Sequence, residues 1–227
     1  MIIELDNITK TYINGGAGIK REVLKGISLS VEKGGVLSIV GPSGSGKSTL
    51  LNIIGTLDKA SSGNMKLDDK DISQFNDNQL AELRNQKIGF IFQSHHLLPQ
   101  LNILENVLVP TIPLKDKKLK ELSMERALSL LEYVGLKDRM HQLPGQLSGG
   151  EAQRTAVVRA LINEPEIILA DEPTGSLYLD SAEMIGELLS KINKEKNVAL
   201  IVVTHSLSLA NRIGNIYSIT NGLLKKD

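Results

Sequence analysis

A glycine-rich run between residues 41 and 48 carries the clearest chemistry in this sequence. Its residues, Gly41-Pro42-Ser43-Gly44-Ser45-Gly46-Lys47-Ser48, fit the pattern G-x-x-x-x-G-K-[ST]. Glycines let the backbone curl so that successive N–H groups point inward around an anion, and a helix that follows adds partial positive charge. The Lys47 ammonium can reach the outer phosphates of a nucleotide, and the Ser48 hydroxyl suits Mg²⁺, which prefers oxygen ligands. The run therefore predicts a nucleotide phosphate site, and the alternative is a glycine-rich turn that matches by accident.

Two carboxylates, Asp171 and Glu172, end the apolar run Ile167-Ile168-Leu169-Ala170. In a parallel sheet, ligands bind at the carboxyl ends of the strands, where the glycine-rich run also begins. Because side chains alternate along a strand, we expect the two carboxylates to point to different faces. We assign Asp171 to Mg²⁺, through water, and Glu172 to the base that polarises the attacking water. The alternative is an ordinary strand end followed by an acidic turn.

Two further polar residues follow apolar runs in the same way. His205 follows residues 200–203 and is a candidate for contact with a γ-phosphate, although a lone histidine is more often structural or exposed. Gln93 follows Ile88–Phe92 and could complete the shell of Mg²⁺ or of the attacking water. By spacing alone, each of these two residues is a weaker candidate than the glycine-rich run.

The segments around these residues indicate an α/β domain. Short apolar runs alternate with helical patterns, which is typical of a largely parallel sheet. Residues 2–12 and 24–31 alternate more loosely and predict an antiparallel β-layer at the N-terminus. The predicted buried strands are Val36–Val40, Ile88–Phe92, 167–170 and 200–203, and the predicted helices are roughly 47–55, 117–134, 150–163 and 181–195.

The middle of the chain differs from the rest. Residues 94–144 are polar and predicted to be helical, with prolines at three positions. We therefore expect a helical subdomain, about residues 94–150, inserted into a single domain of residues 1–227. Its leucines at helical spacing are Leu119, Leu122, Leu128 and Leu131, and its prolines are Pro99, Pro110 and Pro113.

Composition excludes several classes of protein. The chain has 26 basic and 26 acidic residues and 3% aromatic residues, which argues against a protein whose main task is to bind nucleic acid. It has no cysteine, which excludes a disulfide scaffold and a thiolate metal site and fits a reducing compartment. The first six residues include acids, unlike a signal peptide. No run approaches the ~18 apolar residues of a membrane span, so we expect any membrane role to come through a partner.

The run Leu147-Ser148-Gly149-Gly150-Glu151, followed by Ala152-Gln153-Arg154, identifies a family. A serine and two glycines at a helix start form a second anion site, although read alone they are only a capping turn. The run resembles the signature of ABC transporter ATP-binding subunits. Its position between the phosphate loop and the acidic strand end also fits that family, and the resemblance covers essentially the whole chain.

The resemblance implies roles for individual residues. Tyr12 is expected to stack on adenine, Gln93 to couple the site to a membrane subunit, and His205 to act as the switch histidine. Glu172 is present rather than replaced, which favours hydrolysis over binding alone. The expected ATP-binding residues are Tyr12, Gly41, Pro42, Ser43, Gly44, Ser45, Gly46, Lys47, Ser48, Thr49 and Gln93. The expected catalytic residues are Glu172, His205 and Lys47, and the expected metal ligands are Ser48, Gln93 and Asp171.

The resemblance also implies partners. In this family the signature of one subunit, here Leu147, Ser148, Gly149, Gly150 and Glu151, closes over the phosphate loop of a second copy. Two ATP molecules with Mg²⁺ are thereby sandwiched in a head-to-tail dimer, which drives integral membrane permease subunits by closing and opening. The chain is thus expected at the cytoplasmic face of the inner membrane as a peripheral subunit, without direct contact with cargo or nucleic acid.

Residues 92–99, Phe92-Gln93-Ser94-His95-His96-Leu97-Leu98-Pro99, followed by Leu104-Glu105-Asn106-Val107, favour one branch of the family. They resemble the subfamily of lipoprotein-release, macrolide-efflux and cell-division ATPases, and the two histidines with the following Leu-Leu-Pro are most similar to the lipoprotein-releasing branch. Efflux of macrolides or peptides, or a role in cell division, remains the alternative. We expect residues 93–110 to contact the permease. Adjacent histidines lack the spacing of a helical zinc site.

One position departs from the family pattern. Tyr178 stands where the family usually has an aspartate that helps the two nucleotide sites sense each other. We therefore expect weakened coupling between the sites, with some hydrolysis retained. Three other classes remain open: a soluble ABC ATPase of DNA repair or translation, a small-molecule kinase, and a non-hydrolysing scaffold. The first would carry a long coiled coil or two ATPase halves, and the second would not explain residues 147–151.

Overall fold

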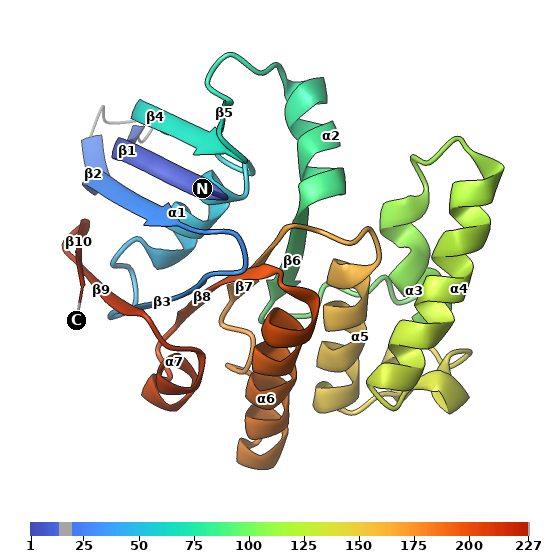
Figure 1. The fold of residues 1–227 in the computed structure, drawn as a ribbon. Coiled ribbons are helices and arrows are strands. Elements are labelled where there is room, and N and C mark those ends of the chain that lie inside the picture. Colours follow the sequence, from blue (N-terminus) through green and yellow to red (C-terminus); the bar gives the residue numbers. More distant parts are fainter. Residues whose placement is uncertain (14–19, 227) are drawn as a thin grey trace.

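The computed structural model describes residues 1–13 and 20–226, in which two sheets are surrounded by helices (Figure 1). The smaller sheet is antiparallel and has the strand order β2-β1-β4-β5. Its strands are β1 (Ile3–Ile13), β2 (Lys20–Val31), β4 (Ser62–Leu67) and β5 (Lys70–Asp71). It confirms the antiparallel layer that the loose alternation predicts at the N-terminus.

The larger sheet is mostly parallel and has the strand order β10-β9-β3-β8-β7-β6. Only its edge strand β10 pairs antiparallel, with β9, among the pairs of the described residues. Its strands are β3 (Val36–Val40), β6 (Ile88–Phe92), β7 (Ile167–Asp171), β8 (Ala199–Thr204), β9 (Ile216–Thr220) and β10 (Leu223–Lys226). The α/β fold with a mostly parallel sheet is therefore confirmed.

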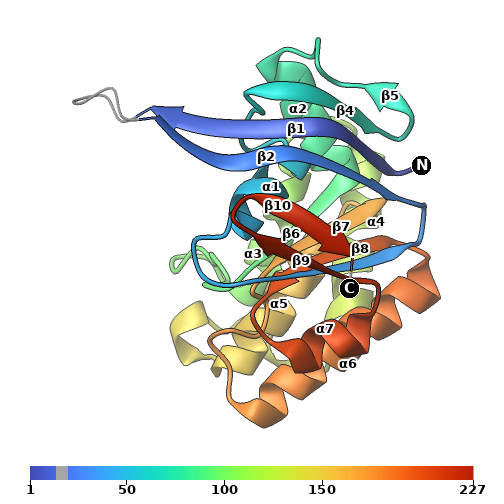
Figure 2. The ribbon, with the colours of Figure 1, turned by 90° about the vertical axis from the view of Figure 1, so that its left-hand side faces the viewer.

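The central parallel strands β7 and β8 are almost entirely apolar because both faces of their sheet are covered. In β7, Ile167 and Leu169 pack toward the antiparallel sheet and α1 (Lys47–Ile54), whereas Ile168 and Ala170 pack toward the helices on the other face. Figure 2 shows these layers from the side, with α6 and α7 on the face opposite to the antiparallel sheet. The helices beyond α1 are α2 (Asp77–Lys87), α3 (Ile103–Leu108), α4 (Lys117–Tyr133), α5 (Gly149–Leu161), α6 (Leu179–Lys196) and α7 (Leu207–Ile213).

Helix α2 is absent from the sequence-based expectations, and α3 falls within the expected helical stretch 94–144 without having been given bounds of its own. Of the residues of α2, only Leu80 is buried, so the helix carries no apolar stripe that periodicity could reveal. Both helices begin with a capping box, from Asn76 to Gln79 in α2 and from Asn102 to Glu105 in α3. These capping boxes were the available sequence signal.

The prediction of a helical stretch from residue 94 was partly wrong. Helix begins only at Ile103, and residues 94–102 form turns and bends. The helix that the leucine spacing indicates is confirmed as α4, whose buried face is Ser123, Ala127, Leu130 and Leu131, whereas Leu119 and Leu122 are exposed. Helices α3 and α4 lie side by side on the far side from the antiparallel sheet, and they share an apolar core with α5 and the parallel sheet (Figure 1).

Candidate nucleotide-binding site

The phosphate loop, residues 41–46, connects β3 to α1. Gly44 and Gly46 have φ angles of 75° and 108°, which non-glycine residues rarely adopt. A Cβ atom at Gly46 would lie 2.9 Å from Leu24 Cδ2, so packing against β2 also requires glycine there. The loop thus takes its shape from its own residues, and it turns the N-terminal end of α1 toward the cavity described below.

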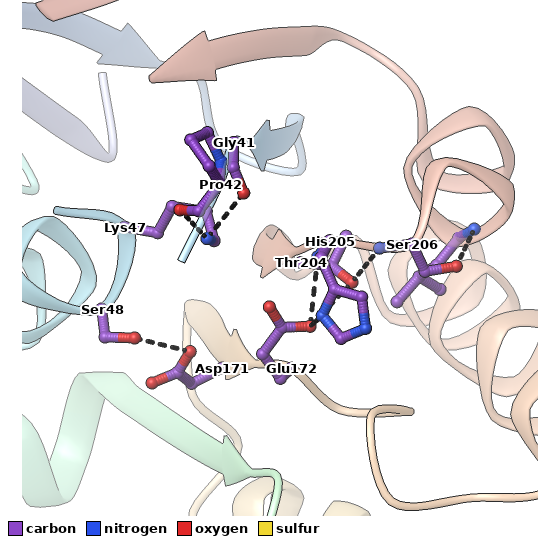
Figure 3. A network of polar contacts seen from close by, with 10 residues as sticks. Gly41, Pro42, Lys47, Ser48, Asp171, Glu172, Thr204, His205 and Ser206 are labelled. Atoms are coloured by element: carbon purple, nitrogen blue, oxygen red, sulfur yellow. Dashed lines mark hydrogen bonds and ion pairs between the residues drawn. The ribbon is translucent and has the colours of Figure 1, made fainter. Parts of the chain in front are cut away.

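The ammonium of Lys47 lies inside this loop, and the residue is only 8% exposed. It donates hydrogen bonds to the carbonyl oxygens of Gly41 at 2.8 Å and Pro42 at 3.0 Å (Figure 3). A buried ammonium that is satisfied by neutral carbonyls can exchange them for phosphate oxygens, which form stronger, charge-assisted hydrogen bonds. The position therefore suits contact with the outer phosphates of a nucleotide.

Asp171 and Ser48 face each other across the gap between β7 and α1. The Ser48 hydroxyl donates to Asp171 Oδ1 at 3.1 Å (Figure 3). Burial raises the pKa of the Asp171 carboxyl, and the Ser48 hydrogen bond opposes this only in part. A cation placed here would offset the cost of burying the carboxylate. The oxygen atoms of both residues are the hard donors that Mg²⁺ prefers.

Glu172 turns away from Asp171, as expected for the two carboxylates. The strand ends at Asp171, and Glu172 takes a φ of 45°, while its N–H donates to Val203 O at 2.9 Å. Its Oε2 accepts from Thr204 Oγ1 at 3.0 Å and lies 2.9 Å from His205 Nδ1 (Figure 3). A left-handed conformation in a non-glycine residue is a strain of about 1–3 kcal/mol. The contacts with the end of β8 hold the carboxylate in this position.

His205 follows β8, which lies between β3 and β7 in the sheet. The histidine therefore emerges between the phosphate loop and the two carboxylates, as its sequence position predicts. Its side chain is 67% exposed, and Nδ1 is within reach of Glu172. Thr204 completes this group and is missing from the sequence-based candidates, although it is the polar last residue of a buried strand.

A cavity of about 840 Å³ joins most of these groups. Gly41, Pro42, Ser45 and Asp171 are not among its lining residues. Three lining residues, Ile13, Arg21 and Val23, were missed by sequence reasoning because only the pairing of β1 with β2 places them here. The cavity is lined by Tyr12, Ile13, Arg21, Val23, Ser43, Gly44, Gly46, Lys47, Ser48, Thr49, Gln93, Glu172 and His205.

Tyr12 stands at the rim of the cavity and is fixed by two residues that sequence reasoning missed. Its hydroxyl donates to Asp58 Oδ2 at 2.7 Å, and the Lys10 ammonium lies 4.8 Å from the ring centroid. Burial, reinforced by the hydrogen bond to Asp58, raises the pKa of the Tyr12 hydroxyl. Tyr12 as a whole is 41% exposed, which leaves aromatic surface on which a base can stack.

Gln93 also lines the cavity and lies close to the chain that follows Glu172. A Cβ atom at Gly175 would lie 2.9 Å from Gln93 Nε2, so the absence of a side chain at Gly175 leaves room for the amide. The Gln93 carbonyl accepts from Ser176 Oγ at 3.0 Å. The structure thus brings Gln93 to the same cavity as Ser48 and Glu172.

The signature run begins helix α5, where Ser148 is the N-cap and forms a capping box with Glu151. The backbone N–H of Ser148 lowers the pKa of the Glu151 carboxyl. A Cβ at Gly149 would meet Leu177 at 3.3 Å and one at Gly150 would meet Ser181 at 3.1 Å, so the run packs beside the start of α6. In the part of the chain that the structure describes, no signature residue lines the cavity.

Two further features are absent from the part of the chain that the structure describes. Among the described residues, no group of three or more His, Cys, Asp or Glu side chains is arranged to hold a metal ion. Of the helices in residues 1–13 and 20–226, none is long and apolar enough to cross a membrane.

The phosphate loop, the acidic strand end and the signature at the start of α5 define an ABC-type ATPase. In agreement, the ABC transporter family model matches residues 24–175, which is more than half of the chain. The chain belongs to the ABC transporter family and is an ATP-hydrolysing member of it.

Relatives that match nearly the whole chain sharpen this assignment. The lipoprotein-releasing system ATP-binding protein LolD of Saccharophagus degradans is 44% identical over 99% of this chain and 97% of its own length. The LolD protein of Syntrophus aciditrophicus is 45% identical over 97% of each. Among solved structures, the ATP-binding cassette MJ0796, a dimer in a post-hydrolysis state with ADP and Pi, matches with a TM-score of 0.86. It is 40% identical, and the match covers 99% of this chain and 98% of that one.

Proposed function

We propose that this chain is the ATPase subunit that energises the release of lipoproteins from the inner membrane. The observation that carries the proposal is the similarity, at 44–45% identity over almost the full length, to ATP-binding proteins of lipoprotein-releasing systems. The run His95-His96-Leu97-Leu98-Pro99 also favours this branch. Efflux or cell division, served by the same subfamily, is the alternative, and a soluble non-transport ATPase is a more distant one.

The site supports a hydrolytic mechanism in which each part has one task. Tyr12 stacks on adenine, and the loop N–H groups with Lys47 bind the phosphates. Glu172 polarises the attacking water, and His205, beside it, contacts the γ-phosphate. Ser48, Asp171 and Gln93 would hold Mg²⁺, whose charge stabilises the negative charge on the phosphates during transfer. Two contacts support these roles. The Lys47 ammonium donates to a carbonyl oxygen of the phosphate loop, and the Glu172 carboxylate lies beside the His205 ring.

A second copy of the chain completes this site in our proposal. The described lining residues of the cavity include none from the signature run, so residues 147–151 are free to act on another molecule. The helix start at Ser148 offers backbone N–H groups to an anion. The solved cassette that is 40% identical to this chain is dimeric, which supports the same head-to-tail arrangement here.

The partners that we propose are integral membrane permeases, with the chain as a peripheral subunit at the cytoplasmic face. A groove of about 450 Å³ lies between α2, β6 and the segment around Pro110, and it is lined in part by Leu57, Phe90 and His96. Its position next to residues 93–110 suits the docking of a permease segment. We further propose that residues 94–150 form a helical subdomain within the single ATPase domain, with no direct contact to cargo.

The test is a capture experiment with a Glu172→Gln variant, which should bind ATP without cleaving it. The tagged variant is expressed in its native host, membranes are solubilised with ATP and Mg²⁺, and the bound proteins are identified by mass spectrometry. Permeases with large periplasmic domains, together with acylated proteins, would support lipoprotein release. Permeases with an efflux adaptor, or division proteins, would move the chain to a sister branch. Recovery of ribosomes or repair factors instead would refute a transport role.

Tyr178 bears on how strongly the two proposed sites communicate. Its side chain is 92% exposed, and it lies just before α6, whose start packs against the signature glycines. A tyrosine cannot supply the charge of the aspartate that the family usually has there. We expect Tyr178→Asp to raise the ATPase rate or the cooperativity in ATP, measured on the purified chain. If neither quantity changes, weakened coupling is not the consequence of Tyr178.

A further inference from the structure

Strand β2 contains one extra residue relative to β1 beside the nucleotide cavity. Lys10 lies opposite Leu24 in the ladder of the two strands. The next residue of β1, Thr11, lies opposite Glu22, so Val23 is the extra residue. Such a β-bulge shifts the register by one residue, and it changes which side chain of the bulged strand points to a given side of the sheet.

The bulge decides which charge stands beside Tyr12. In the observed register Arg21 lies opposite Tyr12, whereas the register before the bulge, if continued, would put Glu22 there. Directly opposite residues of an antiparallel pair point to the same side of the sheet. The bulge thus places a cation rather than a carboxylate next to Tyr12, on the side of the cavity that both Tyr12 and Arg21 line.

The Arg21 side chain extends from β2 to the phosphate loop. A Cβ atom built on Gly44 would lie 3.9 Å from Arg21 Nη2. Gly44 is one of the loop glycines with a positive φ, so this part of the loop presents bare backbone to the guanidinium. The positive charge of Arg21 is therefore held at the loop, although its backbone lies opposite Tyr12 in the β-layer.

The guanidinium of Arg21 is exposed, and no hydrogen bond or ion pair engages it within residues 1–13 and 20–226. Other arginines are held by the protein: Arg84 donates to Thr56 O at 2.9 Å, and Arg212 pairs with Glu187. A guanidinium carries five N–H donors in a planar fork that matches two oxygens of a phosphate. Arg21 can thus bind a phosphate without first giving up a contact within this part of the chain.

The order of the groups along the cavity indicates which phosphate Arg21 meets. Tyr12 is the proposed stacking partner of adenine, and Lys47 suits the outer phosphates. In ATP, the α-phosphate lies between the nucleoside and the outer phosphates. Arg21 starts opposite Tyr12 and ends at the loop, so its guanidinium lies along the stretch where the α-phosphate belongs.

We propose that Arg21 is a further nucleotide-binding residue, whose guanidinium donates to the α-phosphate of the bound nucleotide. The inference rests on the proposed nucleotide site and adds to it a residue that belongs to none of its motifs. Because hydrolysis leaves the α-phosphate unchanged, this contact stabilises bound ATP and bound ADP alike. It sets the affinity for nucleotide and not the rate of the chemical step.

The first test is nucleotide binding by the full-length chain with Mg²⁺ in the Glu172→Gln background, in which ATP persists. In calorimetric titrations we expect Arg21→Met to raise Kd roughly tenfold for both ATP and ADP, because charge-assisted hydrogen bonds are lost. Arg21→Lys should raise Kd about threefold, since an ammonium keeps the charge but not the fork. In the hydrolysing chain, Arg21→Met should raise KM and leave kcat within about twofold.

Lys25→Met is the matched control. Lys25 is an exposed cation of the same strand that lines a smaller hollow of about 380 Å³ with Ser45, but not the nucleotide cavity. Its loss should change Kd by less than about twofold. Equal losses of affinity in Arg21→Met and Lys25→Met would mean that Arg21 contributes only its long-range charge, and this result would overturn the proposal.

Thermal unfolding separates binding from stability. Without nucleotide, Arg21→Met should have the Tm of the parent, because the described structure holds the guanidinium by no contact. The increase in Tm that ATP causes should be smaller in the variant. A Tm that falls without nucleotide, with an unchanged increase on adding ATP, would make Arg21 a structural residue and contradict the proposal.

The second test identifies the phosphate. In ATPαS, sulfur replaces one non-bridging oxygen of the α-phosphate, and sulfur is the weaker hydrogen-bond acceptor. In the Glu172→Gln chain, at least one ATPαS diastereomer should bind roughly fivefold more weakly than ATP, and Arg21→Met should abolish this difference. ATPγS is the control, because its α-phosphate is intact. An ATPαS difference that persists in Arg21→Met would refute a contact between Arg21 and the α-phosphate.

Failure of this inference can be told apart from failure of the proposed function. If Lys47→Ala abolishes ATP binding and Arg21→Met has no effect, the nucleotide site stands and the role of Arg21 is refuted. If neither variant changes ATP binding, the proposed site itself is wrong. The capture experiment reports on the transport role whatever the result for Arg21.

Discussion

The phosphate loop and the segment of residues 93–102 have the same place in the fold and are built in opposite ways. Each leaves a strand of the parallel sheet, β3 or β6, and leads to a helix, α1 or α3. The phosphate loop takes its positive φ angles at Gly44 and Gly46. The segment 93–102 contains no glycine, and its positive φ angles fall on His95 and His96.

The two loops differ in which residues determine their backbone conformation. Glycine reaches the left-handed region without side-chain strain, so the phosphate loop carries its shape in its own sequence. The segment 93–102 is held from outside by Arg159 and Gln153 of α5 and by Asn106 of α3. Asn106 is fully buried, accepts from Leu98 N at 2.7 Å and donates to three carbonyl oxygens. A loop that is shaped by distant residues can respond when those residues move.

The largest expected effect is in the phosphate loop. Gly46→Ala places a Cβ 2.9 Å from Leu24 at a φ of 108°, so we expect a loss of about 3 kcal/mol in the free energy of unfolding and loss of ATP binding. Chemical denaturation measures the free energy of unfolding, and nucleotide titration measures ATP binding. Gly145→Ala is the control and should be nearly neutral, since open space surrounds that position. Retained ATP binding by Gly46→Ala would contradict a locally determined loop.

We expect Asn106→Ala to lower the free energy of unfolding by about 2 kcal/mol, because it leaves several backbone groups of the segment without partners. Recovery of permeases in the capture experiment should fall as well, while ATP binding persists. Asn193→Ala is the matched control: it removes hydrogen bonds to Gly34 O and Val198 O, away from the segment. It should lower stability and leave permease recovery unchanged; parallel losses in both variants would argue against a specific role for Asn106.

We expect the free energies of unfolding of two His96 variants to differ by about 1 kcal/mol. Both His96→Ala and His96→Gly lose the stacking on Phe92, but only glycine relieves the strain of a φ of 51°. His96→Gly should therefore be the more stable variant in urea denaturation. If alanine were equal or better, the left-handed conformation of His96 would not be strained, and the contrast with the phosphate loop would weaken.

The smallest effect concerns Asp58, which accepts a hydrogen bond from Tyr12 at the cavity. Although burial alone would raise its pKa, hydrogen bonds from Lys10, Tyr12 and the Lys59 N–H lower the pKa of the Asp58 carboxyl below its usual value. A depressed carboxyl pKa stabilises the fold above the unfolded-state value, near 3.8, and this stabilisation is lost as pH falls through the folded-state pKa. Asp58→Asn should lower the free energy of unfolding by less than about 1 kcal/mol at pH 7, because the carboxyl group is partly exposed.

The pH dependence provides the check on that prediction. Urea denaturation of the two proteins between pH 7 and pH 3 should show a stability difference that shrinks on the acidic side. A difference that stays constant with pH would mean that the charge of Asp58 contributes nothing and that only the hydrogen-bonding shape of the side chain matters.

The accuracy of the sequence-based expectations follows the same division. The phosphate loop, the ends of β7 and β8 and the four predicted helices lie within a few residues of their expected places, because local periodicity and glycine content specify them. The leucine spacing of α4 predicted a helix but not its buried face. Leucines at helical spacing do not reveal which side meets α5, and Leu119 with Leu122 proved to be exposed.

The sequence alone determined the class of protein and the order of the strands and helices around the site, and it is the source of the residues proposed for phosphate, metal and base. These depend on short-range conformational preferences and on residue chemistry. Tertiary structure alone decided that Arg21 and Val23 line the cavity, that Asp58 and Lys10 fix Tyr12, and that Arg159 holds the turn after Gln93. Such contacts join residues far apart in the chain, and only the pairing of strands and the packing of helices bring their side chains within reach.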